Sequence, residues 1–196
     1  MTVPTLRSRL EAGLVPGDVV SLVAALSFVA LAVLGDPISV ALFLLVLGGT
    51  VVPRAVGASP VLDVVTCASL VVAGWASHLD WYSAVPWLDL ALHAACTGVL
   101  AAVAELVLRR SVRVRGASRE GDAAEDLAGA RTRVETVLLV GGTGSVLAIL
   151  WEIGEWAGHT FLDESIGVGY TDTVSDLVAG LAGSLAAGVL VARSAR

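Results

Sequence analysis

Long apolar stretches separated by short polar turns run from about residue 18 to about residue 192 of this chain. A helix needs about 20 apolar residues to cross the hydrocarbon core of a bilayer. About six stretches reach or approach that length, at 18–35, 37–53, 60–77, 86–108, 134–158 and 172–192. The sequence therefore predicts an all-α, polytopic membrane helical bundle with about six transmembrane helices in one domain, residues 1–196.

The composition is typical of a membrane protein and argues against a nucleic-acid-binding one. Only 15% of the 196 residues are charged, whereas about 25% is usual for a soluble domain. The net charge of −6 provides no basic surface for a phosphate backbone. We therefore expect membrane lipid and no nucleic acid among the partners, and the sequence leaves a homo-oligomer open.

All 12 basic residues are arginines, and their positions predict the orientation of the bundle. They are Arg7, Arg9, Arg54, seven arginines within 109–133, Arg193 and Arg196. With six spans, all of these segments fall on one side of the membrane, and arginine-rich loops are typically cytoplasmic. We expect a multi-pass protein of the plasma (inner) membrane with cytoplasmic N- and C-termini and a cytoplasmic loop over 109–133.

Two further patterns concern the boundary and the packing of the spans. Tryptophans gather near the predicted outer ends, as in the aromatic belt of membrane proteins, at Trp75, Trp81, Trp87, Trp151 and Trp156.

Small residues recur every four positions near the C-terminus, at Gly180, Ser184 and Gly188 and at Ala179, Gly183 and Ala187. Such spacing predicts close helix contacts. Packing is also expected for the glycine-rich run 141–145, because no strand precedes it as in a dinucleotide-binding turn.

Acids and histidines form three short clusters at the ends of apolar stretches. They are Asp89 and His93, then Glu152, Glu155 and His159, then Asp172 and Asp176. Within each cluster, successive members are three or four residues apart, so they share one face of a helix. The predicted topology puts all three clusters near the extracytoplasmic ends of their helices, where they can converge on one centre.

A divalent metal ion would explain this convergence. Buried together, the carboxylates would repel one another, and the three spans that carry them contain no arginine or lysine. The expected metal ligands are Asp89, His93, Glu152, Glu155, Asp172 and Asp176, with His159 and His78 as weaker candidates. Oxygen and imidazole ligands suit Zn²⁺, Mn²⁺, Fe²⁺ or Mg²⁺. Glu152 or Glu155 can instead serve as a general base through a bound water.

Simpler roles exist for several of these residues. Asp89 and Asp172 can stabilise the positive N-terminal ends of their helices. His93 can hydrogen-bond a neighbouring helix, and His159 can lie in the following loop. His78 fits a solvated residue of the third loop. The simpler roles are weakest for the two glutamates, which lie between two tryptophans in a span.

The same residues resemble a known family. The run 151–156 (Trp-Glu-Ile-Gly-Glu-Trp), the run 172–177 (Asp-Thr-Val-Ser-Asp-Leu) and the upstream Asp89, His93 and Gly98 resemble the YjdF-like inner-membrane proteins over about residues 20–192. The 172–177 run also resembles the VanZ-like membrane proteins distantly. The resemblance implies a bacterial or archaeal protein embedded in the membrane, with the same acidic site and topology and with no assigned reaction.

Three classes of function follow from the clusters, and the substrate stays unknown. The first is a metal-binding membrane protein with its site at the extracytoplasmic side, and this class includes a metal-dependent enzyme acting on a lipid or lipid-soluble substrate. The second is a cation or proton transporter or channel, which would also use acids at another depth, such as Asp63 and Glu105 on the cytoplasmic side. The third is a structural or partner-binding protein in which the acids form a hydrogen-bonded staple.

Overall fold

The computed structural model describes residues 15–117 and 132–194, and the regular elements in those ranges are α-helices. Six of these helices are long and apolar enough to cross a membrane, which confirms the predicted all-helical class and the number of spans. They are α2 (Pro16–Leu34), α3 (Pro37–Ala55), α4 (Pro60–His78), α6 (Pro86–Ala117), α8 (Arg133–Phe161) and α9 (Tyr170–Ser194). A short helix, α5 (Trp81–Ala84), lies between α4 and α6, in a segment that the sequence predicted as a loop.

Local sequence explains where most spans begin. Four of them start at a proline: Pro16, Pro37, Pro60 and Pro86. The first position of a helix needs no backbone N–H donor, and the fixed φ of proline suits a helix. Before α3, the carboxylate of Asp36 accepts a hydrogen bond from the backbone N–H of Ser39 at 3.1 Å, which caps the helix.

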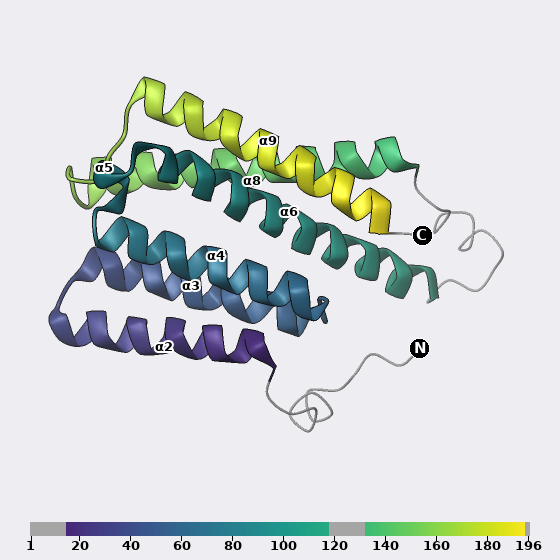
Figure 1. Ribbon diagram of the computed structural model, residues 1–196, viewed down its shortest axis with the longest axis horizontal. Coiled ribbons are helices and arrows are strands. Elements are labelled where there is room, and N and C mark those ends of the chain that lie inside the picture. The colour runs from purple at the N-terminus through teal and green to yellow at the C-terminus, as the bar shows by residue number, and fades with distance from the viewer. Residues whose placement is uncertain (1–14, 118–131, 195–196) are drawn as a thin grey trace.

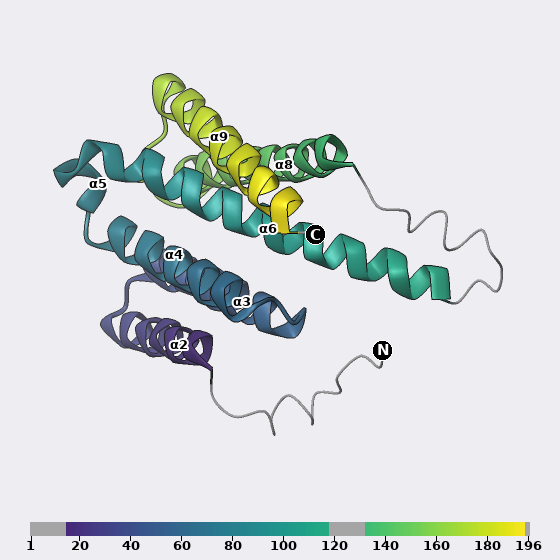
Figure 2. The same ribbon diagram turned by 45° about the vertical axis from the view of Figure 1, so that its right-hand side comes forward.

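The helices form two three-helix units. In the first unit α2, α3 and α4 pack together, and in the second α9 packs extensively against both α6 and α8. Figures 1 and 2 show the two units side by side, and α4 and α6 form the contact between them. The three acidic clusters all belong to the second unit, so the packing of α6, α8 and α9 decides whether they meet.

Small residues allow α9 to lie very close to both of its neighbours. A Cβ atom at Gly183 would collide with the carbonyl group of Ala94 on α6, and a Cβ atom at Gly144 of α8 would collide with Ser184 of α9. Further along α9, a Cβ atom at Gly188 would come within 3.0 Å of the backbone of α8. These contacts confirm the predicted role of the small residues, including a packing role within the run 141–145.

Trp75 lies inside the first unit. Its ring meets Phe43 edge-on at 5.4 Å between centroids, and its Nε1 donates a hydrogen bond to the Ser27 hydroxyl of α2 at 3.1 Å. An indole whose N–H finds an acceptor on another helix is stable against an apolar core, so Trp75 faces the helices of its own unit. Its place in the aromatic belt stays a prediction. The other four tryptophans are exposed: Trp81, Trp87, Trp151 and Trp156.

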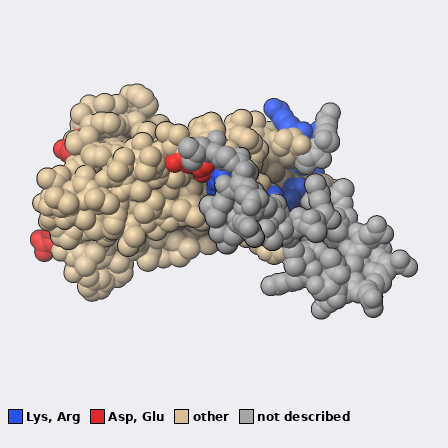
Figure 3. Space-filling model, turned by 90° about the horizontal axis from the view of Figure 1, so that it is seen from below, with Lys and Arg blue, Asp and Glu red and all other residues tan. Residues whose placement is uncertain are grey.

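Four helix ends next to the undescribed segments lie at the same end of the bundle. The start of α2, the end of α6, the start of α8 and the end of α9 are at the right in Figure 1, and α5 and the segment before α9 are at the left. Figure 3 shows a largely uncharged face whose visible arginine atoms lie between the middle and the right-hand end. These are the ends of the described helices only, and the side of the membrane on which the two termini lie stays a prediction.

The helix α6 continues beyond its apolar part. The helix α6 runs from Pro86 to Ala117, so residues 109–117, predicted as the start of a loop, are helical. Arginine is a good helix former, and positive charge is favourable near a helix C-terminus. These arginines therefore extend the helix instead of ending it, and the remainder of the predicted loop, 118–131, lies outside the described residues.

Candidate metal centre

Three of the expected ligands meet at one end of the second unit. Asp89 and His93 come from α6 and Asp176 comes from α9, and one ligand atom of each lies within 4.8 Å of the others. The Nε2 atom of His93 is 3.4 Å from Oδ1 of Asp89 and 3.8 Å from Oδ2 of Asp176. An ion with ligand bonds of about 2.1 Å holds its ligands roughly 3.0–3.4 Å apart. Small side-chain adjustments would therefore bring these three groups onto one cation.

The three ligands are positioned in two different ways. Asp89 and His93 are one turn apart on α6, and because that helix begins at Pro86, Asp89 lies in its first turn. Asp176 depends on a contact between helices, because α9 packs closely against α6, as at Gly183 and Ala94. The Asp176 side chain is only 2% exposed. The centre thus combines a local pair with a third residue supplied by tertiary packing.

Glu152 and Glu155 add two carboxylates from α8. Glu152 is buried and interacts electrostatically with His93 and Asp89, and the half-buried Glu155 interacts with Glu152, His93 and Asp176. Within the described part of the chain, Oε1 of Glu152 and Oδ1 of Asp176 are buried without a hydrogen-bond partner. A buried polar atom without a partner is costly. A cation or a proton shared among these oxygens would remove that cost.

Three other expected ligands lie outside the group of three. Asp172 is exposed in the first turn of α9, where the helix dipole favours an acid, and it interacts electrostatically with Glu152 and Asp176. Nδ1 of His159 lies 2.7 Å from the carbonyl oxygen of Ile166, in the segment after α8. His78, at the end of α4, lies 3.3 Å from the carboxylate of Asp36 in the first unit. Both histidines therefore have partners of their own, as their simpler roles require.

Tyr82 adjoins the centre although sequence reasoning did not single it out. The residue lies on α5, and its hydroxyl donates a hydrogen bond to the carbonyl oxygen of Ala73 at 3.2 Å. Burial raises the pKa of the Tyr82 hydroxyl, and the negative charges of Asp89 and Asp176 raise it further. The phenol therefore stays neutral beside the acids. A four-residue helix has no hydrophobic periodicity, so no sequence signal pointed to this residue.

The acids at the other end of the bundle have separate partners. Glu105 lies about 24 Å along α6 from Asp89 at 1.5 Å per residue. Its Oε1 atom is 2.6 Å from Nε of Arg109, and Arg109 also donates to the hydroxyl of Thr136 on α8 at 3.3 Å. Asp63 belongs to the first unit, where its carboxylate accepts a weak hydrogen bond from its neighbour on α4. The expected separation of these acids from the outer cluster is thus present.

One family matches almost the whole chain. The family model described as "Predicted membrane protein (DUF2238)" covers residues 17–196. The chain belongs to this family. YjdF is a member, so the resemblance carried by the runs 151–156 and 172–177 is confirmed. The distant likeness to VanZ-like proteins stays a prediction. No curated protein and no solved structure matches the chain significantly.

Proposed function

We propose that this protein binds a divalent metal ion near the extracytoplasmic ends of its helices and uses the ion in chemistry on a lipid or lipid-soluble substrate. The ligands are Asp89, His93 and Asp176, with Glu152 and Glu155 beside them. One observation carries the proposal: the three side chains meet within 4.8 Å of one another, and the group includes buried carboxylate oxygens without a hydrogen-bond partner in the described chain.

Charge balance supports a cation. The centre combines four carboxylates with a single imidazole, and among the described residues its ion pairs are those of His93 with Asp89 and Asp176. Like charges repel strongly where the dielectric constant is low, and a divalent cation offsets two of them. Protons can also neutralise carboxylates, so protons and metal would compete for the same oxygens.

The donor set indicates a reactive ion more than a structural one. Three protein ligands leave coordination positions open, as in catalytic metal sites. Carboxylates with one imidazole suit Zn²⁺, Mn²⁺, Fe²⁺ or Mg²⁺, and such an ion activates water or polarises a substrate oxygen. The partnerless oxygen of Glu152 can accept a proton from water near the ion, and Glu155 is the second candidate for this general-base role.

A cation or proton transporter or channel is the second candidate, and the burial of Glu105 favours it. Glu105 is 1% exposed and provides an acid at a second depth on the helix that carries His93. Against this, the second unit is most tightly packed between the two depths, where Gly183 meets Ala94 and Gly144 meets Ser184. An ion could pass only if these helices separated, so we prefer the metal-dependent function.

A purely structural role for the acids is the third class. A hydrogen-bonded staple needs donors for its oxygens, because native structures pair most of their buried polar groups. Glu152 has a hydrogen-bond partner in Thr173, but its Oε1 atom and Oδ1 of Asp176 have none among the described residues, which does not fit such a staple. This class requires that the combined change Glu152→Gln with Asp176→Asn leave folding and function normal.

Metal analysis of the purified protein tests the proposal. We expect a stoichiometric amount of one divalent metal in the wild type and its loss in the His93→Ala and Asp176→Asn variants. Glu164→Gln is the matched control, because Glu164 is an exposed acid in the segment before α9. Wild-type protein that holds no stoichiometric metal after supply of all four candidate ions would refute the proposal. Ion flux in vesicles that Glu105→Gln abolishes would favour the transporter.

A further inference from the structure

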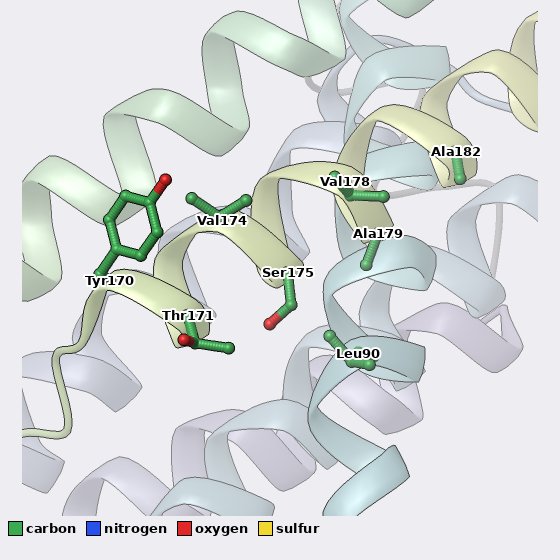
Figure 4. Close-up of a pocket in the computed structure, with 8 residues that line it drawn as sticks. All are labelled: Leu90, Tyr170, Thr171, Val174, Ser175, Val178, Ala179 and Ala182. Atoms are coloured by element: carbon green, nitrogen blue, oxygen red, sulfur yellow. The ribbon is translucent and has the colours of Figure 1, made fainter.

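A groove between the start of α8 and the end of α9 has two arginines in its lining. Its volume is about 300 Å³, its charged residues are Arg133 and Arg193, and apolar side chains of both helices line the rest. The hollow between α6 and the first half of α9, drawn in Figure 4, differs because none of the described side chains that line it is charged. The α8–α9 groove therefore offers a specific chemistry to a ligand, which an apolar hollow does not.

The packing of α8 and α9 leaves this groove open toward the membrane. A Cβ atom at Gly188 would come within 3.0 Å of the backbone of Val137, so the two helices touch at this level. One turn further along α9, the small, buried Ala192 lines the groove and leaves space unfilled. The lining residues Val134 and Leu138 are exposed and belong to a candidate membrane span, so the groove faces the lipid.

The groove is charged at one end and apolar at the other. Arg133 is the first residue of α8, and Arg193 lies in the last turn of α9. The lining residues Val137 and Val189 lie one turn further into the two spans, about 6 Å away along each helix at 1.5 Å per residue. The arginine end is the one that we expect at the cytoplasmic interface, at the level of lipid phosphates. The groove thus has the polarity order of a membrane lipid.

The two arginines of the groove differ from the other arginines whose side chains the structure describes. Arg54 pairs with an acid of α2 at 3.2 Å, Arg109 with an acid one turn earlier on α6 at 2.6 Å, and Arg110 donates to a backbone carbonyl oxygen at 3.0 Å. Arg133 and Arg193 have no hydrogen bond or ion pair with any described residue. Both guanidinium groups are exposed and can therefore bind an anion.

The surroundings of the arginines add to their positive charge. Glu135 is the described acid nearest to Arg133 in the sequence, but it does not line the groove, and its carboxylate accepts a hydrogen bond from the backbone N–H of Thr132 at 2.7 Å. The positive end of the helix dipole of α8 lies at the same place. Guanidinium groups bind phosphate oxygens in pairs, and basic pockets between transmembrane helices on the cytoplasmic side bind anionic headgroups.

We propose that the α8–α9 groove binds an anionic glycerophospholipid, with its phosphate held by Arg133 and Arg193 and one acyl chain against Val137 and Val189. Charge complementarity favours this occupant over a second copy of the protein. A symmetric pair of copies would bring the same arginines of both chains together, and like charges repel. The proposal does not rest on the metal centre, because Asp176 lies about 26 Å along α9 from Arg193 at 1.5 Å per residue.

Native mass spectrometry of the full-length protein in detergent tests the proposal. Delipidated protein receives phosphatidylglycerol or phosphatidylethanolamine with identical dioleoyl chains; both lipids carry a phosphate, but only the first has a net charge. We expect the wild type to bind one phosphatidylglycerol several-fold more tightly than phosphatidylethanolamine. Arg133→Gln and Arg193→Gln should each remove most of this preference. Arg110→Gln is the matched control and should keep it, because Arg110 is exposed and does not line the groove.

A second pair of variants tests the place of the acyl chain. Val189→Phe should weaken phosphatidylglycerol binding several-fold by filling the apolar end of the groove. Val178→Phe should not, because Val178 is an exposed valine of the same helix outside this groove. Equal effects of the two changes would contradict the proposed position of the chain. A change of oligomeric state that only Val189→Phe produces would assign the groove to a second copy instead.

Three further results would overturn the lipid assignment. The first is equal binding of the two lipids by the wild type, or a preference that survives both arginine variants. The second is competition by glycerol phosphate as strong as that by phosphatidylglycerol, which would indicate a site for free phosphate. The third is a clearly lower thermal midpoint of both arginine variants without lipid, since the arginines would then serve contacts within the chain. We expect these midpoints to stay close to that of the wild type.

Discussion

The Nε2 atom of His93 lies 3.8 Å from Oδ2 of Asp176, across the contact between α6 and α9. This distance depends on the approach of the two helices at Gly183 and Ala94, where a side chain on the glycine would meet a carbonyl group. The geometry of the candidate metal centre therefore depends on the packing of the helices in the second unit. A change that separates the helices should weaken metal binding, and bound metal should stabilise the helix contact.

The Glu152→Gln variant should change metal affinity and stability in opposite directions. We expect metal affinity to fall by roughly 10–100-fold, the usual cost of losing a group that supports a metal site. Without metal, the thermal midpoint should equal or exceed that of the wild type, because a neutral amide replaces a buried acid whose Oε1 has no partner. Titration against a metal indicator and thermal unfolding with and without a chelator measure the two effects.

The exposed-acid variant Glu164→Gln provides the control for Glu152→Gln and should change neither quantity. A Glu152→Gln variant with unchanged affinity and a lower midpoint would show that Glu152 is a structural hydrogen-bond acceptor. That result would contradict its place in the centre.

Gly183→Ala should destabilise the second unit by about 1–3 kcal/mol, the usual cost of overpacking. The new Cβ atom would meet the carbonyl group of Ala94, and the resulting shift of α9 should also lower metal affinity. Gly142→Ala is the matched control, because no atom lies within 4 Å of a Cβ atom there. Alanine should stabilise that helical position by about 0.5–1 kcal/mol. Equal effects of the two changes on detergent-solubilised protein would contradict the close α6–α9 contact.

Asp36→Ala should cost about 0.5–2 kcal/mol, because Asp36 caps α3. Hydrogen bonds from the Ser39 side chain and backbone hold the pKa of Asp36 below its ordinary value. A carboxyl group with a lowered pKa in the folded state contributes its full stability above the unfolded pKa of about 3.9. That contribution disappears as the pH falls through the folded pKa.

The unfolding free energy measured across the pH range tests whether the stabilisation by Asp36 is lost at low pH. The difference between the wild type and Asp36→Ala should be constant near neutral pH and should shrink below about pH 4. Ser59→Ala removes an N-cap that does not titrate, at the start of α4, and its cost should not depend on pH in this range. If the difference in unfolding free energy between the wild type and Asp36→Ala grew as the pH fell, Asp36 would not be the charged cap of α3.

Arg109→Gln should destabilise the protein by about 1–3 kcal/mol, because the buried Glu105 loses a charged partner at 2.6 Å. The double variant Glu105→Gln with Arg109→Gln should recover part of this loss, and a double-mutant cycle measures the coupling. Metal content should be normal in Arg109→Gln, in Glu105→Gln and in the double variant, since this pair lies about 24 Å along α6 from Asp89. Loss of metal in Glu105→Gln would instead couple the two ends of the bundle, as a transporter requires.

Local rules account for most of the fold. Apolar length identified the six spans, because this signal lies within each segment. Sequence reasoning missed α5, which is too short for a periodic pattern. It also ended α6 too early, because arginine marks the limit of a membrane span but not the end of a helix.

The partners of side chains inside the bundle could be identified only from the tertiary structure. Trp75 and Trp81 look equivalent in the sequence, both near the third loop, but Trp75 finds Ser27 on α2 as a hydrogen-bond partner and packs against the core of the first unit. Tyr82 adjoins the acids because of the turn that joins the two units. No local pattern contains these partners, since they come from other helices.

Asp172 and Asp176 show the division most clearly. The sequence by itself determined that both lie on one face of one helix, because the hydrogen bonds of an α-helix repeat every four residues. Only the tertiary structure decided between them. α9 packs closely against α6 and α8, and Asp176 is buried beside His93, whereas Asp172, one turn earlier, stays exposed. Helical pairing is a local property, whereas burial depends on which surfaces of distant segments fit together.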